Sequence, residues 1–590
     1  MAASRIRKST GRHPTPLPLA AFLARLAFQD AGAEVADVLD PACGDGRLLG
    51  AVLDCAGRER SSGLRLTGID LDEEALSSAR GKLRGRAVAA LHLVRGDFLL
   101  GFEEGAEGGL WPPHAGLRLV EGFDLIIANP PYVRTQVLGA ARSRRLSRTL
   151  GLSDRVDLYH AFVAGMARCL RPGGRLALLC SNRFLTTRSG SSMRGLLRRQ
   201  FKVERIIDLG DTGLFSAAVL PAIVIARKNR SGPQVRRPAG QASPQEDAAP
   251  FMRILRHRGS PPSEPVPPHP DVLQAIAGGA EGLITAGGRR FVIDRGTLEL
   301  PDADSSPWTP RREASRGWSA RISEKTAMTF GAVLRIRVGL KTTADAIFIR
   351  RDWTHLQNRV RPEPELLRPL LTHEVAAPYL PLRQPQKRVL YPHTKRHGRR
   401  CPVDLARYPG AAGYLQQFQE RLAAREYLRK AGRQWYELWV SQDPEAWGAP
   451  KLVLPDISEQ PRCFLDESGA LVNGDCYWLT TREGVDHRML LLVLAVANSS
   501  LGSRFYDEYC SNRLYSGRRR YITQYLSRFP LPDISHPVAL RILDLVSLRL
   551  ALRPEPGPEH QELERRIDSL VWQAFGLEPE PRRSSVQITA

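Results

Sequence analysis

The residues best suited to chemistry in this chain are the four consecutive residues Asn129, Pro130, Pro131 and Tyr132. They follow the apolar run Leu125–Ile127, which predicts a strand that ends where they begin. The amide oxygen of Asn129 and the main-chain carbonyl of Pro130 are two acceptors on a backbone that the prolines stiffen. Two converging acceptors suit an exocyclic amine, which offers two N–H donors. Tyr132 adds a flat face on which a flipped-out base can stack.

The alternative is that these residues have only a structural role, as a Pro-Pro turn that ends a strand. The residues upstream decide between the two interpretations. Ala36–Asp40 predicts a buried strand, and Pro41–Gly46 then leads into an amphipathic helix that begins at Arg47. Gly44 and Gly46 allow a tight turn and a close approach of the backbone to a ligand. Taken alone, this pattern is a weak indication of a nucleotide-binding fold.

Two further predicted strands also end in polar residues. Residues 64–69 predict a strand that leads into Asp70, a carboxylate placed to accept hydrogen bonds from ribose hydroxyls. Residues 90–94 predict a third strand, followed by Asp97 and Phe98, which could bracket an adenine by hydrogen bond and by contact. One acidic strand end is usually plain surface. Several polar or glycine-rich strand ends in register favour a ligand site.

The following residues complete an alternating pattern of strands and helices. A helix is predicted over about residues 158–170, and a turn over 171–174 leads to a strand at 175–180. Strands at 203–209 and 220–226 bring the predicted total to seven. This alternation predicts an α/β fold, a Rossmann-like seven-stranded sheet with helices on both faces.

Together these motifs resemble the TaqI-type, or gamma-class, N6-adenine DNA methyltransferases over roughly the first 230 residues. The resemblance includes Gly11–Pro16, a segment that in this family contacts the methionine part of S-adenosylmethionine. It also includes the segment Val156–Gly174 and the strand end Ala226–Lys228. The motif order, with the cofactor segment first and the recognition region last, fits the gamma class. The resemblance implies a class I methyltransferase domain with S-adenosylmethionine as methyl donor.

The resemblance assigns roles position by position. Thr15 and Ala42 would touch the amino-acid end of the cofactor with Asp40 near it, Asp70 would bind the ribose, and Asp97 with Phe98 would hold the adenine. The implied cofactor-binding set is Thr15, Asp40, Ala42, Gly44, Gly46, Asp70, Asp97 and Phe98. The implied catalytic residues are Asn129, Pro130 and Tyr132.

One departure from the family pattern concerns the flipped base. Family members place a second aromatic residue beyond the fifth strand, against the other face of that base. At the aligned point this chain has Gly190 and serines. We therefore expect Phe184, or an aromatic residue elsewhere, to take that role.

Composition agrees with an enzyme that binds a polyanion. The 590 residues leave room for two to four domains. Eight cysteines without a Cys-x-x-Cys pair argue against a zinc site or a disulfide framework, and we expect no metal and a reducing cytoplasm. The sequence has neither a signal peptide nor a run of 18 apolar residues, so we expect no membrane span. The net charge of +23 exceeds what an arginine-rich, GC-rich genome explains, because codon bias does not by itself suppress acidic residues.

Basic residues gather in three places, each of which could be ordinary surface. The first, in a predicted loop just after Tyr132, comprises Arg142, Arg144, Arg145 and Arg148. The second lies within residues 383–400, where Arg and Lys are interleaved with Tyr391, His393 and His397. The third comprises Arg518, Arg519 and Arg520, flanked by tyrosines. Together they predict contacts to the phosphates of double-stranded DNA.

The composition shifts after residue 230. Residues 231–319 are predicted to be a Pro/Gly-rich linker and connector, with short strands at 251–256 and 290–300. Residues 320–577 are predicted to form a mixed α+β target-recognition domain, because Val338–Asp345 and residues 497–532 resemble such domains of this methylase family. Residues 578–590 are predicted to be a disordered tail.

The sequence thus predicts a methyltransferase acting on N6 of a flipped-out adenine in duplex DNA at a specific site. We expect a monomer in the bacterial cytoplasm, bound to the nucleoid, that protects host DNA from a partner restriction endonuclease. A fused enzyme that also cuts DNA is one alternative, although only 39 residues precede Asp40. Methylation of RNA or of a protein amide is a second. A nonenzymatic DNA-binding protein is a third, which the intact motif residues disfavour.

Overall fold

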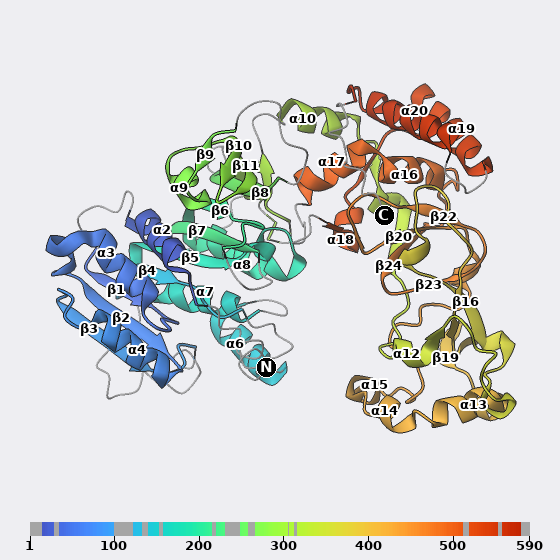
Figure 1. The fold of residues 1–590 in the computed structure, drawn as a ribbon, viewed down its shortest axis with the longest axis horizontal. Helices are drawn as coiled ribbons and strands as arrows, with labels where there is room; N and C mark the ends of the chain where they lie inside the picture. The colour runs from blue at the N-terminus through green and yellow to red at the C-terminus, as the bar shows by residue number, and fades with distance from the viewer. Residues whose placement is uncertain are drawn as a thin grey trace. The chain divides into compact units, whose positions relative to one another are not determined.

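A computed structural model of the chain describes residues 14–28, 35–99, 122–132, 140–152, 157–214, 220–230, 248–257, 266–311 except 302 and 305, 316–510, 518–552 and 557–579. The chain divides into two compact units (Figure 1). The first comprises residues 1–315 with 584–590, and the second comprises residues 316–583.

A twelve-stranded sheet forms the centre of the first unit. Five of its strands are parallel and lie in the order β3-β2-β1-β4-β5. Their bounds are β1 Asp37–Asp40, β2 Arg65–Asp70, β3 Ala90–Arg95, β4 Phe123–Ala128 and β5 Leu170–Ser181. β7 (Pro221–Lys228) then lies antiparallel between β5 and β6 (Phe201–Asp208). The strand order reverses between β1 and β4, which is where open α/β sheets form their ligand crevice.

The sheet is larger than the seven strands expected from the sequence. β6 pairs in parallel with β8, which pairs with β11, and the remaining strands extend that edge. Their bounds are β8 Ala248–Arg256, β9 Pro268–His269, β10 Gly282–Ala286, β11 Arg289–Glu299 and β12 Thr309–Arg311. The strands expected at 251–256 and 290–300 are thus present as β8 and β11, and they continue the sheet where a connector was expected. Without β8, β6 would leave a row of backbone groups unpaired at the edge.

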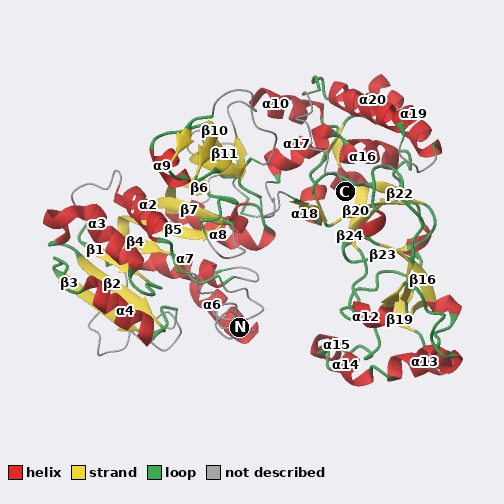
Figure 2. Ribbon diagram, in the orientation of Figure 1, coloured by secondary structure: helices red, strands yellow, loops and turns green. Residues whose placement is uncertain are grey.

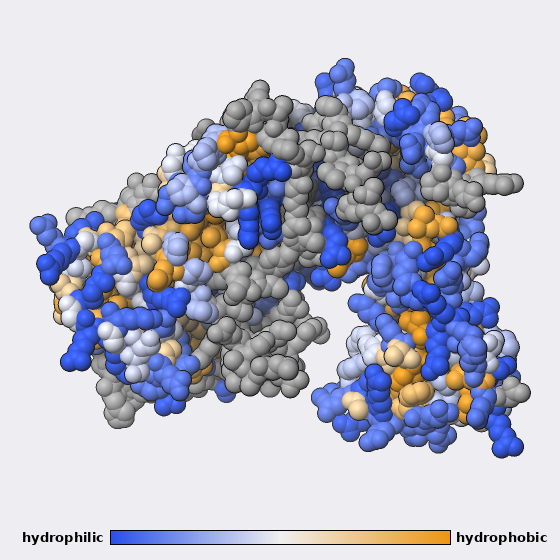
Figure 3. Space-filling view, in the orientation of Figure 1, coloured by the Kyte–Doolittle hydropathy of each residue, from blue (hydrophilic) through white to orange (hydrophobic). Residues whose placement is uncertain are grey.

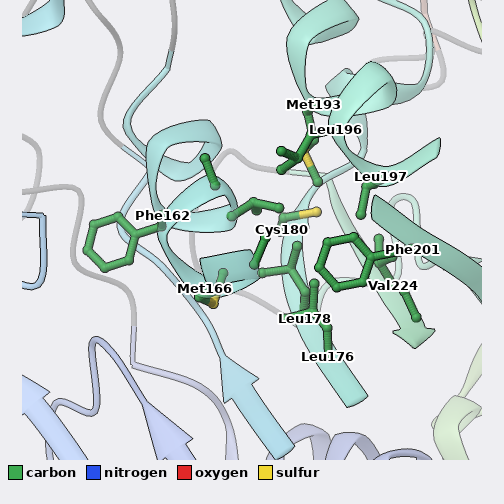
Figure 4. Close-up of a cluster of buried hydrophobic side chains, with 14 of the residues drawn as sticks. Phe162, Met166, Leu176, Leu178, Cys180, Met193, Leu196, Leu197, Phe201 and Val224 are labelled. Carbon is green, nitrogen blue, oxygen red and sulfur yellow. The ribbon is translucent and has the colours of Figure 1, made fainter. Parts of the chain in front are cut away.

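Helices cover both faces of this sheet (Figure 2). One face packs against α2 (Leu17–Phe28), α3 (Arg47–Ser61), α4 (Glu73–Leu83) and α9 (Val272–Ala277). The other packs against α6 (Ala140–Leu150), α7 (Leu158–Cys169) and α8 (Ser191–Gln200). On this second face Met166 of α7, Met193 of α8 and Leu178 of β5 belong to one buried cluster (Figure 4). Strands buried on both faces are typical of parallel sheets.

The second unit is mixed α+β and has two hydrophobic cores. The core around the sheet β14-β24-β20-β22 is packed by helices α10 Arg316–Lys325, α11 Phe330–Val333, α16 Met489–Asn498, α17 Ser500–Tyr509, α18 Thr523–Leu526, α19 Pro537–Ala551 and α20 Pro558–Ala574. The strands of that sheet are β14 Leu334–Val338, β24 Cys476–Thr481, β20 Lys451–Pro455 and β22 Phe464–Asp466. Two short strand pairs are β13 Met328–Thr329 with β26 Pro530–Leu531, and β21 Ile457–Ser458 with β25 Arg519–Arg520.

The other core surrounds the sheet β15-β17-β16-β23. Its strands are β15 Ile349–Arg350, β17 Lys387–Leu390, β16 Leu367–Leu371 and β23 Leu471–Val472. The helices of this lobe are α12 Asp345–Phe348, α13 Pro409–Gln416, α14 Gln419–Ala423 and α15 Glu426–Lys430. β18 (His393–Arg396) and β19 (Arg399–Pro402) form a separate antiparallel hairpin. Hydrophilic residues cover most of the visible face of the second unit, with a few hydrophobic ones between them (Figure 3).

Among the described residues, no single helix has the length and hydrophobicity to cross a membrane. α16 and α17 meet the criterion only as a pair, and the chain bends by 72° between them. Nearly all of α16 is buried in the core of the second unit.

One glycine of the sheet sets how closely the loop after β1 lies on β2. A Cβ atom on Gly68 would lie 2.8 Å from Cys43 Sγ and 2.8 Å from a Leu93 methyl group. We predict that Gly68→Ala lowers the free energy of unfolding by about 1–3 kcal/mol, as overpacking of a filled core does.

Urea denaturation measures this effect, and Gly81→Ala is the matched control. Gly81 lies inside α4 with no atom within 4 Å of an added Cβ, so alanine there should raise stability by roughly 0.5–1 kcal/mol. An unchanged unfolding midpoint for Gly68→Ala would contradict the close packing of this loop.

Candidate active site

The polar residues expected at the strand ends lie along one edge of the sheet. In the order β3-β2-β1-β4, Asp97 follows β3, Asp70 ends β2, Asp40 ends β1 and Asn129 follows β4. The four strands are parallel, so their carboxyl ends meet at the same edge. Residues from positions far apart in the chain thus form a single row.

The loop after β1 is held by the carboxylates beside it. The N–H of Ala42 donates to Asp40 Oδ1 at 3.1 Å, and the N–H of Gly44 donates to Asp70 Oδ2 at 2.9 Å. Gly44 and Gly46 have φ angles of 51° and 77°, in the left-handed region that glycine adopts without strain. The loop therefore runs close to both carboxylates, as the sequence led us to expect.

Asp40 is fully buried, and its two carboxyl oxygens differ in their hydrogen bonding. Its Oδ1 accepts the Ala42 N–H, whereas Oδ2 has no hydrogen-bond partner among the described residues. Burial raises the pKa of Asp40 to about 8. The hydrogen bond from Ala42 lowers this pKa, whereas the nearby carboxylate of Asp70 raises it. A buried carboxyl oxygen without a partner favours a cationic ligand group. The ammonium at the amino-acid end of S-adenosylmethionine fits this requirement.

Asp70 accepts a backbone N–H group on each of its carboxylate oxygens. Its Oδ2 accepts from Gly44 and its Oδ1 accepts the N–H of Asp72, each at 2.9 Å. A carboxylate accepts up to about four hydrogen bonds, and acceptors of this kind are what a pair of ribose hydroxyls requires. This fits the role in ribose binding that the family resemblance implies.

Of the two residues expected to bind adenine after β3, one lies in the hydrophobic core. Asp97 Oδ1 accepts the N–H of Leu99 at 3.0 Å. Phe98 is buried and stacks on Phe162 of α7 with ring centroids 5.4 Å apart. Phe98 therefore belongs to the hydrophobic core beside Asp97, and its contact with a cofactor adenine stays a prediction.

Asn129 links the segment before α2 to the aromatic residue of its own motif. Its Nδ2 donates to Thr15 Oγ1 at 3.0 Å, and the Tyr132 hydroxyl donates to its Oδ1 at 2.9 Å. Burial raises the pKa of Tyr132 well above its ordinary value, so the hydroxyl stays protonated at neutral pH. In this state the Asn129 oxygen that could receive an amine is engaged by Tyr132. Pro130, between them in sequence, is buried.

Arg47 was not among the predicted site residues, yet it joins two parts of the site. Its Nη1 donates to the Thr15 carbonyl at 3.2 Å, and its Nε lies 2.8 Å from Asp45 Oδ2. Lys82 of α4 pairs with the same carboxylate. Arg47 is the first residue of α3, where the helix dipole disfavours a cation. That unfavourable position was the signal in the sequence that Arg47 has partners elsewhere.

The expectation that Phe184 faces a flipped base is wrong for this structure. Phe184 is fully buried and packs edge-to-face on Trp308 with ring centroids 6.0 Å apart. A Cβ on Gly190 would lie 2.4 Å from the Phe184 carbonyl oxygen, so no larger residue fits at the position where the family has its aromatic residue. The aromatic ring beside Tyr132 is instead that of Tyr159 in α7, 6.5 Å away between centroids.

The arginines expected to follow the active-site motif lie on a helix, not in a loop. Arg142, Arg144 and Arg145 belong to α6, and Arg145 is exposed. The helix forms because its segment contains neither glycine nor proline and buries Leu146 and Leu150 in the core. The contact of these arginines with DNA phosphates stays a prediction.

The arginines near residue 519 are not equivalent. Arg519 is only 12 % exposed and makes a two-pronged ion pair with Asp507, at 2.8 and 2.9 Å. Arg520 lies 3.4 Å from Asp456, and Arg518 is exposed. Arg519 therefore holds the fold of the second unit, which leaves Arg518 and Arg520 as the better placed of the three for a phosphate.

Two known protein families match parts of this chain. The Eco57I restriction-modification methylase family matches residues 65–215, and the TaqI-like C-terminal specificity domain matches residues 407–531. The Type II methyltransferase M.BanIII of Aneurinibacillus aneurinilyticus is 34% identical over 580 residues, covering 97% of this chain and 98% of that protein. The chain belongs to the TaqI-type restriction–modification methyltransferases.

The chain is also similar to more distant proteins. The Type II methyltransferase M.XhoI of Xanthomonas vasicola is 26% identical over 475 residues, covering 78% of this chain and 77% of that protein. A solved DrdV–DNA complex is 11% identical and covers 92% of this chain and 57% of that chain, with a TM-score of 0.49. The methylase match precedes the specificity-domain match, which confirms the gamma-class order of this methyltransferase.

The site fits S-adenosylmethionine as the methyl donor of this family. Asp40 offers an unpartnered oxygen to its ammonium group, and Asp70 offers acceptors to its ribose. Within the described ranges, no three His, Cys, Asp or Glu residues cluster in a way that could hold a metal ion.

We predict that S-adenosylmethionine binding at about pH 7 releases most of one proton. Asp40, with its pKa of about 8, is mainly protonated in the free protein, and a bound ammonium would lower that pKa. The release should decrease as the pH rises through about 8, because the free carboxyl is then increasingly ionised. Titration calorimetry in buffers of different ionisation enthalpy counts these protons.

Two substitutions on the same strand provide the controls. Asp40→Asn should abolish the proton release. Asp37→Asn should leave it intact, because Arg65 and Arg171 hold the pKa of Asp37 below its ordinary value despite its partial burial. Binding enthalpies that are equal in all buffers for the unmodified protein would contradict the assignment of Asp40.

Proposed function

We propose that this methyltransferase transfers a methyl group from S-adenosylmethionine to N6 of an adenine flipped out of duplex DNA. The observation that carries the proposal is the hydrogen-bond chain from Thr15 through Asn129 to Tyr132, beside Asp40 and Asp70. It sets an amide oxygen and a tyrosine ring next to the residues that fit the cofactor. An exocyclic amine is the group that two converging acceptors and a stacking ring would recognise.

The chemistry would depend on positioning. The adenine amine would displace the Tyr132 hydroxyl from Asn129 Oδ1 and donate its second N–H to the Pro130 carbonyl. The Tyr132 ring, released from that hydrogen bond, would stack on the base. The cofactor supplies an electrophilic methyl group. Asn129 and Pro130 would aim the amine's lone pair at it, so that direct transfer follows from proximity and orientation without a covalent enzyme intermediate.

The second unit would choose the DNA site. Its residues 407–531 match a specificity domain, and the chain's charge of +23 suits a polyanion. We propose that the enzyme acts as a cytoplasmic monomer and protects host DNA from a restriction endonuclease that recognises the same sequence. The alternatives are an enzyme that both cuts and methylates, and one that methylates RNA or a protein amide through the same motif.

We predict that the isolated protein methylates adenine in unmodified genomic DNA, and does so in the presence of EDTA. Mass spectrometry of the digested nucleosides identifies the product as N6-methyladenine. Methyl groups found on cytosine, or only on RNA or protein, would contradict the proposal. Activity that EDTA removes and added metal restores would contradict it as well. Cleavage of the same DNA when magnesium is supplied would instead favour the enzyme that both cuts and methylates.

Two substitutions separate the roles of Asn129 and Tyr132. Asn129→Ala should lower turnover more than tenfold, a barrier increase above about 1.4 kcal/mol, because an acceptor for the amine is lost. Tyr132→Phe should retain most of the activity, because it keeps the stacking ring and removes only the hydroxyl that must leave Asn129. Both variants should bind DNA as tightly as the unmodified protein in a fluorescence anisotropy assay.

Either of two results would contradict these roles. Asn129→Ala with more than a tenth of normal turnover, roughly the 1.4 kcal/mol limit, would move the amine site elsewhere. An inactive but folded Tyr132→Phe would mean that the hydroxyl takes part in the reaction instead of being displaced.

A further inference from the structure

The hairpin β18–β19 is a separate two-stranded sheet in the second unit, near α12–α15 (Figure 1). His393 pairs with Pro402 at its base, and Arg396 pairs with Arg399 at its tip. His397 and Gly398 form the turn with φ angles of 49° and 72°. Positive φ at both turn residues is typical of the type I′ turn, which suits the twist of a tight hairpin.

The base of the hairpin is anchored on both strands. His393 is buried, and its Nε2 accepts the N–H of Leu438 at 3.1 Å. After the second strand, the carbonyl of Val403 accepts the Tyr436 hydroxyl at 2.7 Å. Burial, with the nearby Arg400 and Arg433, lowers the pKa of His393 to about 3, so this anchor stays neutral at physiological pH.

Lys395, on the first strand of the hairpin, is neutralised by two acidic side chains at the surface. Lys395 Nζ lies 2.5 Å from Glu445 and 3.4 Å from Asp443. Lys395 and the anchors at His393 and Val403 thus all contact residues 436–445. These contacts hold the base of the hairpin against residues 436–445.

The tip, in contrast, is exposed and basic. Arg396, Arg399 and Arg400 are exposed, and none of them makes an ion pair or side-chain hydrogen bond with the described residues. Arg396 and Arg399 face each other directly across the two strands. Like charges in that arrangement destabilise a hairpin. A rigid base that presents mutually repelling guanidinium groups favours an external polyanion as the partner.

We propose that the β18–β19 hairpin is a DNA-binding arm that places Arg396 and Arg399 against phosphates of the duplex. This deepens the proposed function and rests on it. A two-stranded ribbon has the width that the major groove admits. The arm itself precedes residues 407–531, which match the specificity domain, whereas its support at residues 436–445 lies within them. Its contacts would therefore be made by an arm that the matched specificity domain supports.

The test compares two pairs of arginines of equal charge in the same unit. Arg396→Ala/Arg399→Ala removes the tip, and Arg541→Ala/Arg566→Ala removes exposed arginines from α19 and α20 that also make no ion pair with the described residues. Binding to a fluorescent random-sequence duplex is measured over a series of salt concentrations. The tip variant should reduce the log–log salt slope by about 0.9 per lost phosphate contact, roughly 1.8 in all, and weaken binding at least tenfold at low salt.

The control pair should leave the slope and affinity near those of the unmodified protein. Arg396→Lys/Arg399→Lys should restore the slope, because an ammonium group also binds phosphate. Thermal melts should be unchanged or slightly raised in the tip variant, since it relieves the repulsion between the two arginines.

The outcomes separate this inference from the proposed function. An unmodified protein that neither binds nor methylates DNA would overturn the proposed function. If it does both, a tip variant with unchanged affinity and slope would overturn the arm alone. Equal losses in the tip and control variants, or a lysine variant no better than alanine, would also overturn it.

Discussion

The site depends on the parallel pairing of β1 with β4, where the strand order of the sheet reverses. Val38 pairs with Leu125 and Leu39 with Ile126, so the chain leaves both strands at the same edge. At the opposite end, the Asp124 carboxylate accepts the N–H groups of Ala36 and Asp37, at 3.0 and 2.9 Å. This pairing places the loop after β1 next to the motif after β4. A shift of one residue would turn each side chain to the other face of the sheet.

Around that pairing, polar groups of the protein hold one another where a ligand is to bind. Asp40 and Asp70 accept N–H groups from the loop they flank, and Asn129 is held between Thr15 and Tyr132. Such bonds orient the side chains before any ligand arrives, which lowers the ordering cost of binding. Asp40 Oδ2, which the described residues leave without a hydrogen-bond partner, lies at the end of the site predicted to bind a cation.

Charge on the second unit has two physical uses. Arg519 with Asp507 and the fully buried Lys451 with Asp466 are internal pairs, and removing either partner would leave a charge without compensation. Arg396 and Arg399 have no such partner among the described residues and repel each other. Both kinds of arginine occur in short basic runs, so a count of basic residues cannot separate them. Only the position of each side chain relative to the core does so.

The sequence by itself determined the order of the strands in the chain, the polar residues that end them, and the family. Strand periodicity and motif spacing are local properties, and they can be read from residues such as Asp40, Asp70 and Asn129–Tyr132. The strands expected at 251–256 and 290–300 are present as β8 and β11. Their place in the large sheet could not be predicted, because pairing with a distant edge leaves no local pattern. The helix α6, the burial of Phe184 and the internal pair of Arg519 were decided by tertiary packing. Each depends on which surfaces meet, and contacts between residues far apart in the chain fix that.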